Sequence, residues 1–117
     1  MHARTSALLA ALLAGLALAA TSGAARTTAP TPVTISILVQ KGRPVGGVKR
    51  PTVRRNALVR LVVRTDVGRE VHVHGYDLEK EVVRGRPTVF RFRARIAGRF
   101  EVELHHPDAL LAELTVR

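Results

Sequence analysis

The chain has 117 residues and a formal net charge of +10, from 19 lysines and arginines against nine acidic residues. This length allows one small domain with a modest core. The absence of cysteine excludes disulfide bridges and any site that needs a thiolate nucleophile or ligand.

The first 24 residues are predicted to be a secretory signal peptide. The apolar run 8–20, interrupted only by Gly15, is shorter than the roughly 20 residues of a membrane span and fits a signal sequence. Cleavage is expected after Ala24, with Ala19 as the alternative site. The protein is therefore expected to be secreted or to lie in the periplasm or cell envelope, without a stable membrane span; an uncleaved anchor is the alternative.

The next segment, residues 25–32, is small and polar with two prolines and is predicted to be a flexible leader. From residue 33 the pattern indicates strands separated by turns. Apolar and polar residues alternate, as expected for strands with one buried face. In this half of the domain, strands are expected at residues 33–41, 51–54, 57–65 and 71–76, with a shorter segment at 79–83.

The clearest strand covers residues 88–96, where Phe90, Phe92, Ala94 and Ile96 alternate with arginines and are expected to face inward. Because Ala97-Gly98 predicts a tight turn, the segment 99–105 is expected to pair with it as a hairpin. Glu101 and Glu103 would then face the arginines across the hairpin. The last strand is expected at 110–117, with one helical turn over 107–113 as the alternative.

Seven or eight short strands with turns between them predict an all-β fold, an antiparallel Greek-key β-sandwich that covers residues 33–117. The sequence offers no support for catalysis. It has no Gly-x-Ser-x-Gly motif and no phosphate-binding loop, and Ser36 is the only serine after the leader. We therefore do not expect an enzyme.

Four histidines of the mature chain form two clusters. His72 and His74 alternate with Val71 and Val73, so both imidazoles should lie on one face of a strand, with Cα atoms about 6.6 Å apart. The second cluster is His105-His106. Imidazoles suit copper, zinc, iron and nickel, and the two clusters together predict a metal site.

Carboxylates near these clusters could complete the site. Asp77, Asp108 or Glu103 could add an oxygen ligand, and Asp77 could instead fix the tautomer of a ligating histidine. The alternative is structural: the histidines would be outward polar residues, and Asp77 would make a turn hydrogen bond after Gly75 and Tyr76.

The basic residues allow a different function. Sixteen of the 19 are arginines, spread over many segments, and such a surface can bind polyanions. They could also simply occupy the solvent-facing side of strands. With one tyrosine, three phenylalanines and no tryptophan, few rings are available to stack bases. Nucleic acid is therefore not expected as a partner.

The layout resembles the cupredoxin fold and, more closely, the small secreted bacterial proteins described as EfeO-type cupredoxin-like domains. The resemblance covers almost the whole mature chain and is carried by the segments 72–77, 90–105 and 114–116. It implies a cupredoxin-like β-sandwich with a metal site at one end.

Blue-copper members carry a mid-chain histidine and then an aromatic-x3-Cys-x2-His-x2-Met pattern. The resemblance places these positions at His72, Phe100, Leu104, Pro107 and Leu110. Three of the four ligands are absent, and a type 1 centre depends on its Cu–thiolate bond. A blue-copper electron carrier is therefore excluded.

The expected function is divalent metal binding, most favourably of Cu(II) in a non-type 1 site, through His72, His74, His105 and His106. The alternative is a metal-free degenerate cupredoxin that acts as a basic interaction module, contacting acidic envelope polymers or an envelope protein.

Overall fold

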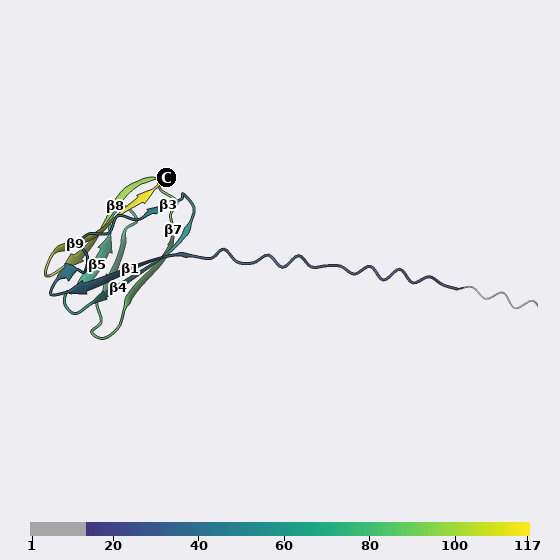
Figure 1. The fold of residues 1–117 in the computed structure, drawn as a ribbon, viewed down its shortest axis with the longest axis horizontal. Coiled ribbons are helices and arrows are strands. Elements are labelled where there is room, and N and C mark those ends of the chain that lie inside the picture. Colours follow the sequence, from purple (N-terminus) through teal and green to yellow (C-terminus); the bar gives the residue numbers. More distant parts are fainter. Residues whose placement is uncertain (1–13) are drawn as a thin grey trace, which may run out of the picture.

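The computed structural model describes residues 14–117 (Figure 1). Residues 14–32 are exposed, have no secondary structure and extend away from the domain. The predicted signal peptide, residues 1–24, lies for its greater part outside the described residues. Among residues 14–117, no helix is long and apolar enough to cross a membrane.

Nine strands make up the described part of the domain. They are β1 (Val33–Gln40), β2 (Arg43–Pro44), β3 (Thr52–Val53), β4 (Leu58–Thr65), β5 (Glu70–Val73), β6 (Leu78–Glu81), β7 (Thr88–Arg93), β8 (Gly98–His105) and β9 (Ala109–Val116). The four-stranded sheet has the order β2-β1-β4-β7, and the five-stranded sheet has the order β3-β9-β8-β5-β6. The predicted all-β sandwich is confirmed.

Both sheets are mixed rather than wholly antiparallel. β1 pairs with β4 in parallel, and β3 pairs with β9 in parallel. A parallel pair needs a crossover of about a dozen residues or more. Residues 41–57 form that crossover between β1 and β4. They include β3, which belongs to the five-stranded sheet. The helical turn that was the alternative for residues 107–113 does not form, because β9 occupies most of that segment.

The predicted hairpin between residues 88–96 and 99–105 is wrong. β7 pairs with β4 in the four-stranded sheet, whereas β8 pairs with β5 and β9 in the other sheet. The chain crosses between the sheets at residues 94–97, so the expected Arg–Glu pairs across a hairpin do not form. Ile96, which the alternation predicts to face inward, is 48% exposed at this crossing. Two consecutive strands that each have one apolar face can bury these faces either as neighbours in one sheet or by facing each other from two sheets. Alternation of apolar and polar residues does not distinguish these two arrangements.

The core lies between the two sheets and is built almost entirely of aliphatic side chains. Its largest fully buried members include Phe90, Ile37, Leu61, Leu104 and Leu111. Val71 and Val73 are fully buried, as the alternation in this segment predicts. Since successive strand residues point to opposite faces, His72 is held on the outer face of the five-stranded sheet.

Gly75 fixes the turn that follows β5. It has a φ of +80°, and a Cβ atom at this position would collide with the ring of Phe100. The next residue, Tyr76, packs against Phe92 and Phe100 with ring centroids 4.9 and 4.8 Å away. Its hydroxyl donates to the carbonyl of Ile96 at 2.8 Å and accepts from the Ile96 N–H at 3.1 Å. This packing anchors the end of β5, and with it His74.

We expect Gly75→Ala to destabilise the domain by about 1–3 kcal/mol, because it adds both left-handed backbone strain and a steric collision. Gly46→Ala is the matched control, since Gly46 has a φ of +82° and its new methyl group would have no atom within 4 Å. Thermal unfolding of both variants measures the difference. Equal losses in the two variants would show that the Phe100 contact contributes nothing.

Candidate metal centre

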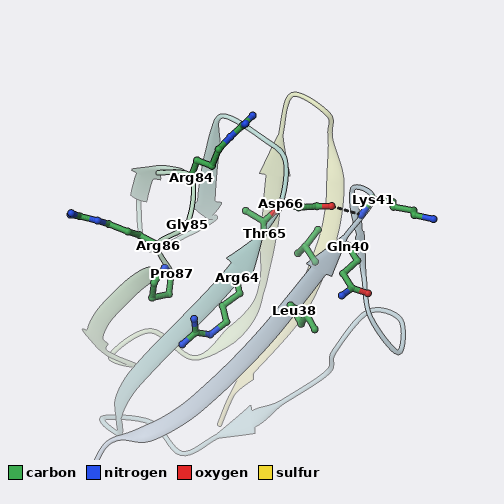
Figure 2. A pocket seen from close by; sticks show the side chains of 11 residues that line it. Leu38, Gln40, Lys41, Arg64, Thr65, Asp66, Arg84, Gly85, Arg86 and Pro87 are labelled. Atoms are coloured by element: carbon green, nitrogen blue, oxygen red, sulfur yellow. Dashed lines mark hydrogen bonds between the residues drawn. The ribbon is translucent and has the colours of Figure 1, made fainter.

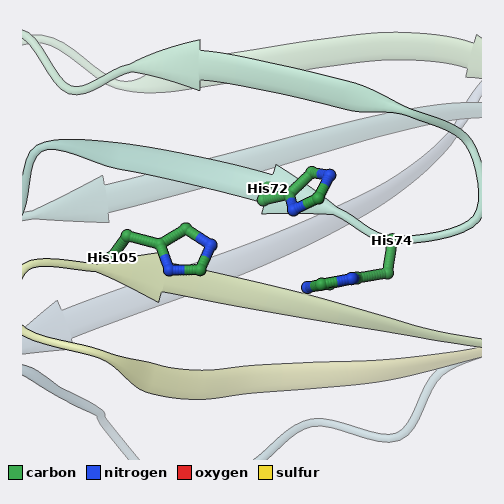
Figure 3. A group of neighbouring side chains, drawn as sticks. All are labelled: His72, His74 and His105. Carbon is green, nitrogen blue, oxygen red and sulfur yellow. The ribbon is translucent and has the colours of Figure 1, made fainter.

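The outer face of the five-stranded sheet brings the predicted histidines together. His72 on β5 lies directly opposite Glu103 on β8, and Glu70 lies opposite His105. Cross-strand neighbours share a face of the sheet. His72, His74 and His105 therefore rise from the same surface, although more than 30 residues separate the first two from the third (Figure 3).

The three imidazoles are close enough to share an ion. Each offers one ring nitrogen, and these nitrogens all lie within 4.8 Å of one another. The ring centroids of His72 and His74 are 4.2 Å apart, and those of His72 and His105 are 6.0 Å apart. Zn–N bonds of 2.0–2.1 Å require nitrogens roughly 3.3 Å apart in a tetrahedral site. Rotation of the side chains can bring the imidazole nitrogens to this separation, because all three side chains are only half-buried.

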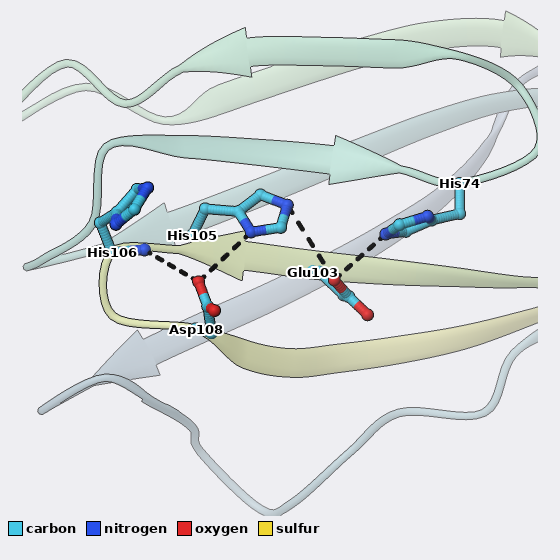
Figure 4. A network of polar contacts seen from close by, with 5 residues as sticks. All are labelled: His74, Glu103, His105, His106 and Asp108. Carbon is cyan, nitrogen blue, oxygen red and sulfur yellow. Dashed lines mark hydrogen bonds and ion pairs between the residues drawn. The ribbon is translucent and has the colours of Figure 1, made fainter.

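Asp108 orients the imidazole of His105. Its Oδ1 lies 3.3 Å from His105 Nδ1 and accepts the backbone N–H of His106 at 3.2 Å (Figure 4). These two contacts lower the pKa of Asp108, so its carboxylate is ionised at neutral pH. An ionised carboxylate only accepts hydrogen bonds, so Nδ1 carries the proton in the neutral ring. Nε2 is then left with its lone pair, as metal ligation requires.

Glu103 lies between two of the imidazoles. Its Oε2 is 3.1 Å from His74 Nε2 and 4.0 Å from His105 Nε2. The shorter contact is not aligned as a hydrogen bond, and His74 Nε2 is buried without a hydrogen-bond partner among the described residues. Burial alone would raise the pKa of Glu103, but the contacts with His74 and Glu101 outweigh it and lower that pKa. Glu103 thus offers an anionic oxygen beside Nε2 of His74, which has no hydrogen-bond partner among the described residues.

The surroundings of this cluster are acidic, although the chain as a whole is strongly basic. All six glutamates lie on the outer face of the five-stranded sheet: Glu70, Glu79, Glu81, Glu101, Glu103 and Glu113. A hydrogen bond and charge repulsion from Glu70 raise the pKa of Glu79, and a hydrogen bond with Glu103 raises that of Glu101. Carboxyl groups crowded in this way favour a nearby cation.

Two residues predicted for the site lie apart from this cluster. His106 is outside the group of three imidazoles and instead lines a shallow hollow with Arg69 and Glu81. Asp77 adopts a φ of +52° in the turn before β6, and within residues 14–117 no hydrogen bond joins it to an imidazole. Asp108, three residues after His105, makes the orienting contact that the sequence suggests for Asp77.

The ligand positions implied by the resemblance do not converge. Leu104, at the cysteine position, is fully buried and faces the core, whereas His72 lies on the outer face. In the pairing of β5 with β8, Leu104 lies opposite Val71 and not opposite His72. The imidazole cluster is therefore a surface site on the sheet, distinct from a centre enclosed between the two sheets.

Comparisons with known proteins identify a shared fold. No family model and no curated protein matches the chain. Among solved structures, it is similar to one described as the "NMR solution structure of copper binding protein in the apo form". The TM-score is 0.55 at 13% sequence identity, and the match covers 72% of this chain and 86% of the other. At this identity the likeness concerns the fold alone: the chain is an all-β sandwich of the same kind.

Proposed function

We propose that this chain is an exported cupredoxin-like protein, of the EfeO-type group, that binds Cu(II) in a non-type 1 site. The observation that carries the proposal is the convergence of three imidazoles on one face of the sheet: His72 from β5, His74 from the turn that follows β5, and His105 from the paired strand β8. The structural neighbour is described as a copper binding protein, which supports the same metal.

The donor set favours copper among the divalent ions. Neutral imidazoles bind Cu(II) and Zn(II), and Cu(II) forms the tighter complexes of the two. Glu103 would act as a fourth donor and offset part of the cation's charge, since its Oε2 lies 3.1 Å from His74 Nε2 and 4.0 Å from His105 Nε2. Without a thiolate the site cannot have type 1 geometry, so we assign the protein a role in metal handling or sensing. Electron transfer and catalysis are not part of the proposal.

Copper binding should stabilise the folded protein. At a free Cu(II) concentration 100 times Kd, the gain is about 2.7 kcal/mol, which for a domain of this size raises Tm by roughly 10–20 °C. Differential scanning calorimetry of the mature protein with Cu(II), with Zn(II) and with a chelator measures the shift. If neither metal raises Tm, the proposal is wrong.

Asp108→Asn is expected to weaken copper binding by roughly 10–100-fold, the usual cost of losing an outer hydrogen-bond partner of a ligating histidine. Asp77→Asn is the matched control and should leave the affinity unchanged, because Asp77 makes no such contact. Isothermal titration with Cu(II) at neutral pH distinguishes the two. Equal losses would contradict the orienting role of Asp108.

The same variant should alter the acid sensitivity of the metal-free protein. The pKa of Asp108 is lowered in the folded state from its ordinary value of 3.8. Its ionisation therefore stabilises the fold above that value, and the stabilisation is lost as pH falls through the lowered pKa. In Asp108→Asn, Tm should consequently fall less steeply below about pH 4 than in the wild type.

A further inference from the structure

The outer face of the four-stranded sheet is basic. Arg60 on β4 lies directly opposite Arg91 on β7, and Leu58 lies opposite Arg93. Arg64 extends the same row, since it alternates with buried Val63. The strands of the four-stranded sheet carry these arginines and no carboxylate, whereas all six glutamates lie on the outer face of the five-stranded sheet.

This arrangement of arginines is not compensated within the domain. Like charges directly opposite each other on a sheet are unfavourable. Among residues 14–117, Arg50 with Glu113 is the one ion pair between a lysine or arginine and a carboxylate. Of the arginines on this face, Arg93 donates a hydrogen bond to the backbone carbonyl of Asn56. The face therefore presents positive charge that a bound anion would neutralise.

The basic face continues into an open hollow of the described surface (Figure 2). The hollow lies between the ends of β1 and β4 and the loop that leads to β7, and its volume is about 860 Å³. Its lining includes Lys41, Arg64, Arg84, Arg86, Leu38 and Pro87. Its one carboxylate, Asp66, accepts the backbone N–H of Lys41 at 3.1 Å.

The cations at this hollow do not converge on one point. Figure 2 shows the side chains of Arg84, Arg86 and Lys41 extending outward in different directions from the rim. A single small anion could not contact all of them. An extended chain with repeated negative charges could contact them one after another, and then follow Arg64 onto the row of arginines across β4 and β7.

We propose that this hollow and the adjoining arginine face form a docking surface for a linear acidic polysaccharide. Arginine pairs well with carboxylate and sulfate-like groups through its forked donors. Leu38, which is 44% exposed, and Pro87 add apolar surface for the C–H faces of sugar rings. This inference does not depend on copper, because the imidazole cluster lies on the opposite sheet.

A polysaccharide fits this surface better than single-stranded nucleic acid. Base recognition without sequence preference uses exposed aromatic rings as stacking platforms. Phe90 is fully buried, and Tyr76, Phe92 and Phe100 pack against the core. In the part of the chain that the structure describes, the arginine face and the hollow thus contain no aromatic side chain.

The test is binding of the mature protein to heparin, as the probe polysaccharide, at increasing salt and in the presence of a chelator. Arg64→Gln/Arg91→Gln should weaken binding roughly two- to thirtyfold, as expected for two exposed charge pairs. Arg50→Gln/Arg99→Gln removes the same charge from the other side of the molecule and should change binding by less than about twofold. Far-ultraviolet circular dichroism and Tm confirm that both variants fold.

Three results would overturn the proposal. Equal losses in the two double variants would show that only the net charge matters. Binding to single-stranded DNA or to anionic vesicles that is tighter than binding to heparin would assign the surface to another partner. Absence of heparin binding at low salt would exclude the surface altogether. These outcomes do not depend on whether the protein binds copper, because the chelator removes metal ions from the heparin assay.

Discussion

His105→Asn is expected to remove the copper-induced rise in Tm, whereas His106→Asn should leave it intact. The two histidines are adjacent in sequence, but only His105 belongs to the group whose ring nitrogens lie within 4.8 Å of one another. His105 is also the one member supplied by β8, so its loss leaves only the pair from β5 and its following turn. We expect the affinity for Cu(II) to fall by more than the roughly 10–100-fold that the loss of an outer hydrogen-bond partner costs.

Asparagine is chosen for both variants because His106 has a φ of +56°. Asparagine tolerates this left-handed conformation better than most residues, so His106→Asn should fold normally. Isothermal titration with Cu(II) and melting curves with and without metal provide the two measurements. If His106→Asn loses the copper response and His105→Asn keeps it, the assignment of the cluster is wrong. Equal responses in both variants would mean that copper binds elsewhere.

Leu104→Ala is expected to destabilise the domain by about 2–5 kcal/mol, a large part of the about 5–15 kcal/mol available to a small domain. Leu104 is 0% exposed and lies on the inner face of β8, directly behind the site. Its side chain also packs so closely on Gly68 that a Cβ atom there would collide with it. Truncation therefore leaves a cavity in a tightly packed part of the core.

Leu110→Ala provides the comparison, because Leu110 is only partly buried at the start of β9. Its loss should cost clearly less than that of Leu104. Urea unfolding of the metal-free proteins measures both values, and an unchanged m-value shows that the folded and unfolded states are comparable. The folded fraction of Leu104→Ala should still bind Cu(II), because Leu104 and His105 point to opposite faces of β8. A copper site that requires Leu104 would contradict the surface location of the imidazoles.

Local alternation predicted which side of each strand is buried. Val71 and Val73 face the core and His72 faces outward, because side chains alternate along a strand whatever its neighbours are. His74 lies on the same outer surface from the turn directly after β5. The turn glycines and prolines likewise marked where most strands end. The sequence also placed carboxylates near the second histidine pair, and Asp108 proved to be the one that contacts Nδ1 of His105.

Pairing between strands was decided only by the tertiary structure. Alternation gives each strand an apolar face but does not say which strand lies beside it, so β7 and β8 could not be assigned to different sheets from sequence. That assignment brings Glu103 and His105 beside His72 and leaves His106 outside the cluster. It also puts the row of arginines on β4 and β7 in a different sheet from the glutamates. The sequence by itself determined an all-β chain with its histidines on a solvent-facing surface. Their convergence on one site is a product of contacts between strands distant in the chain.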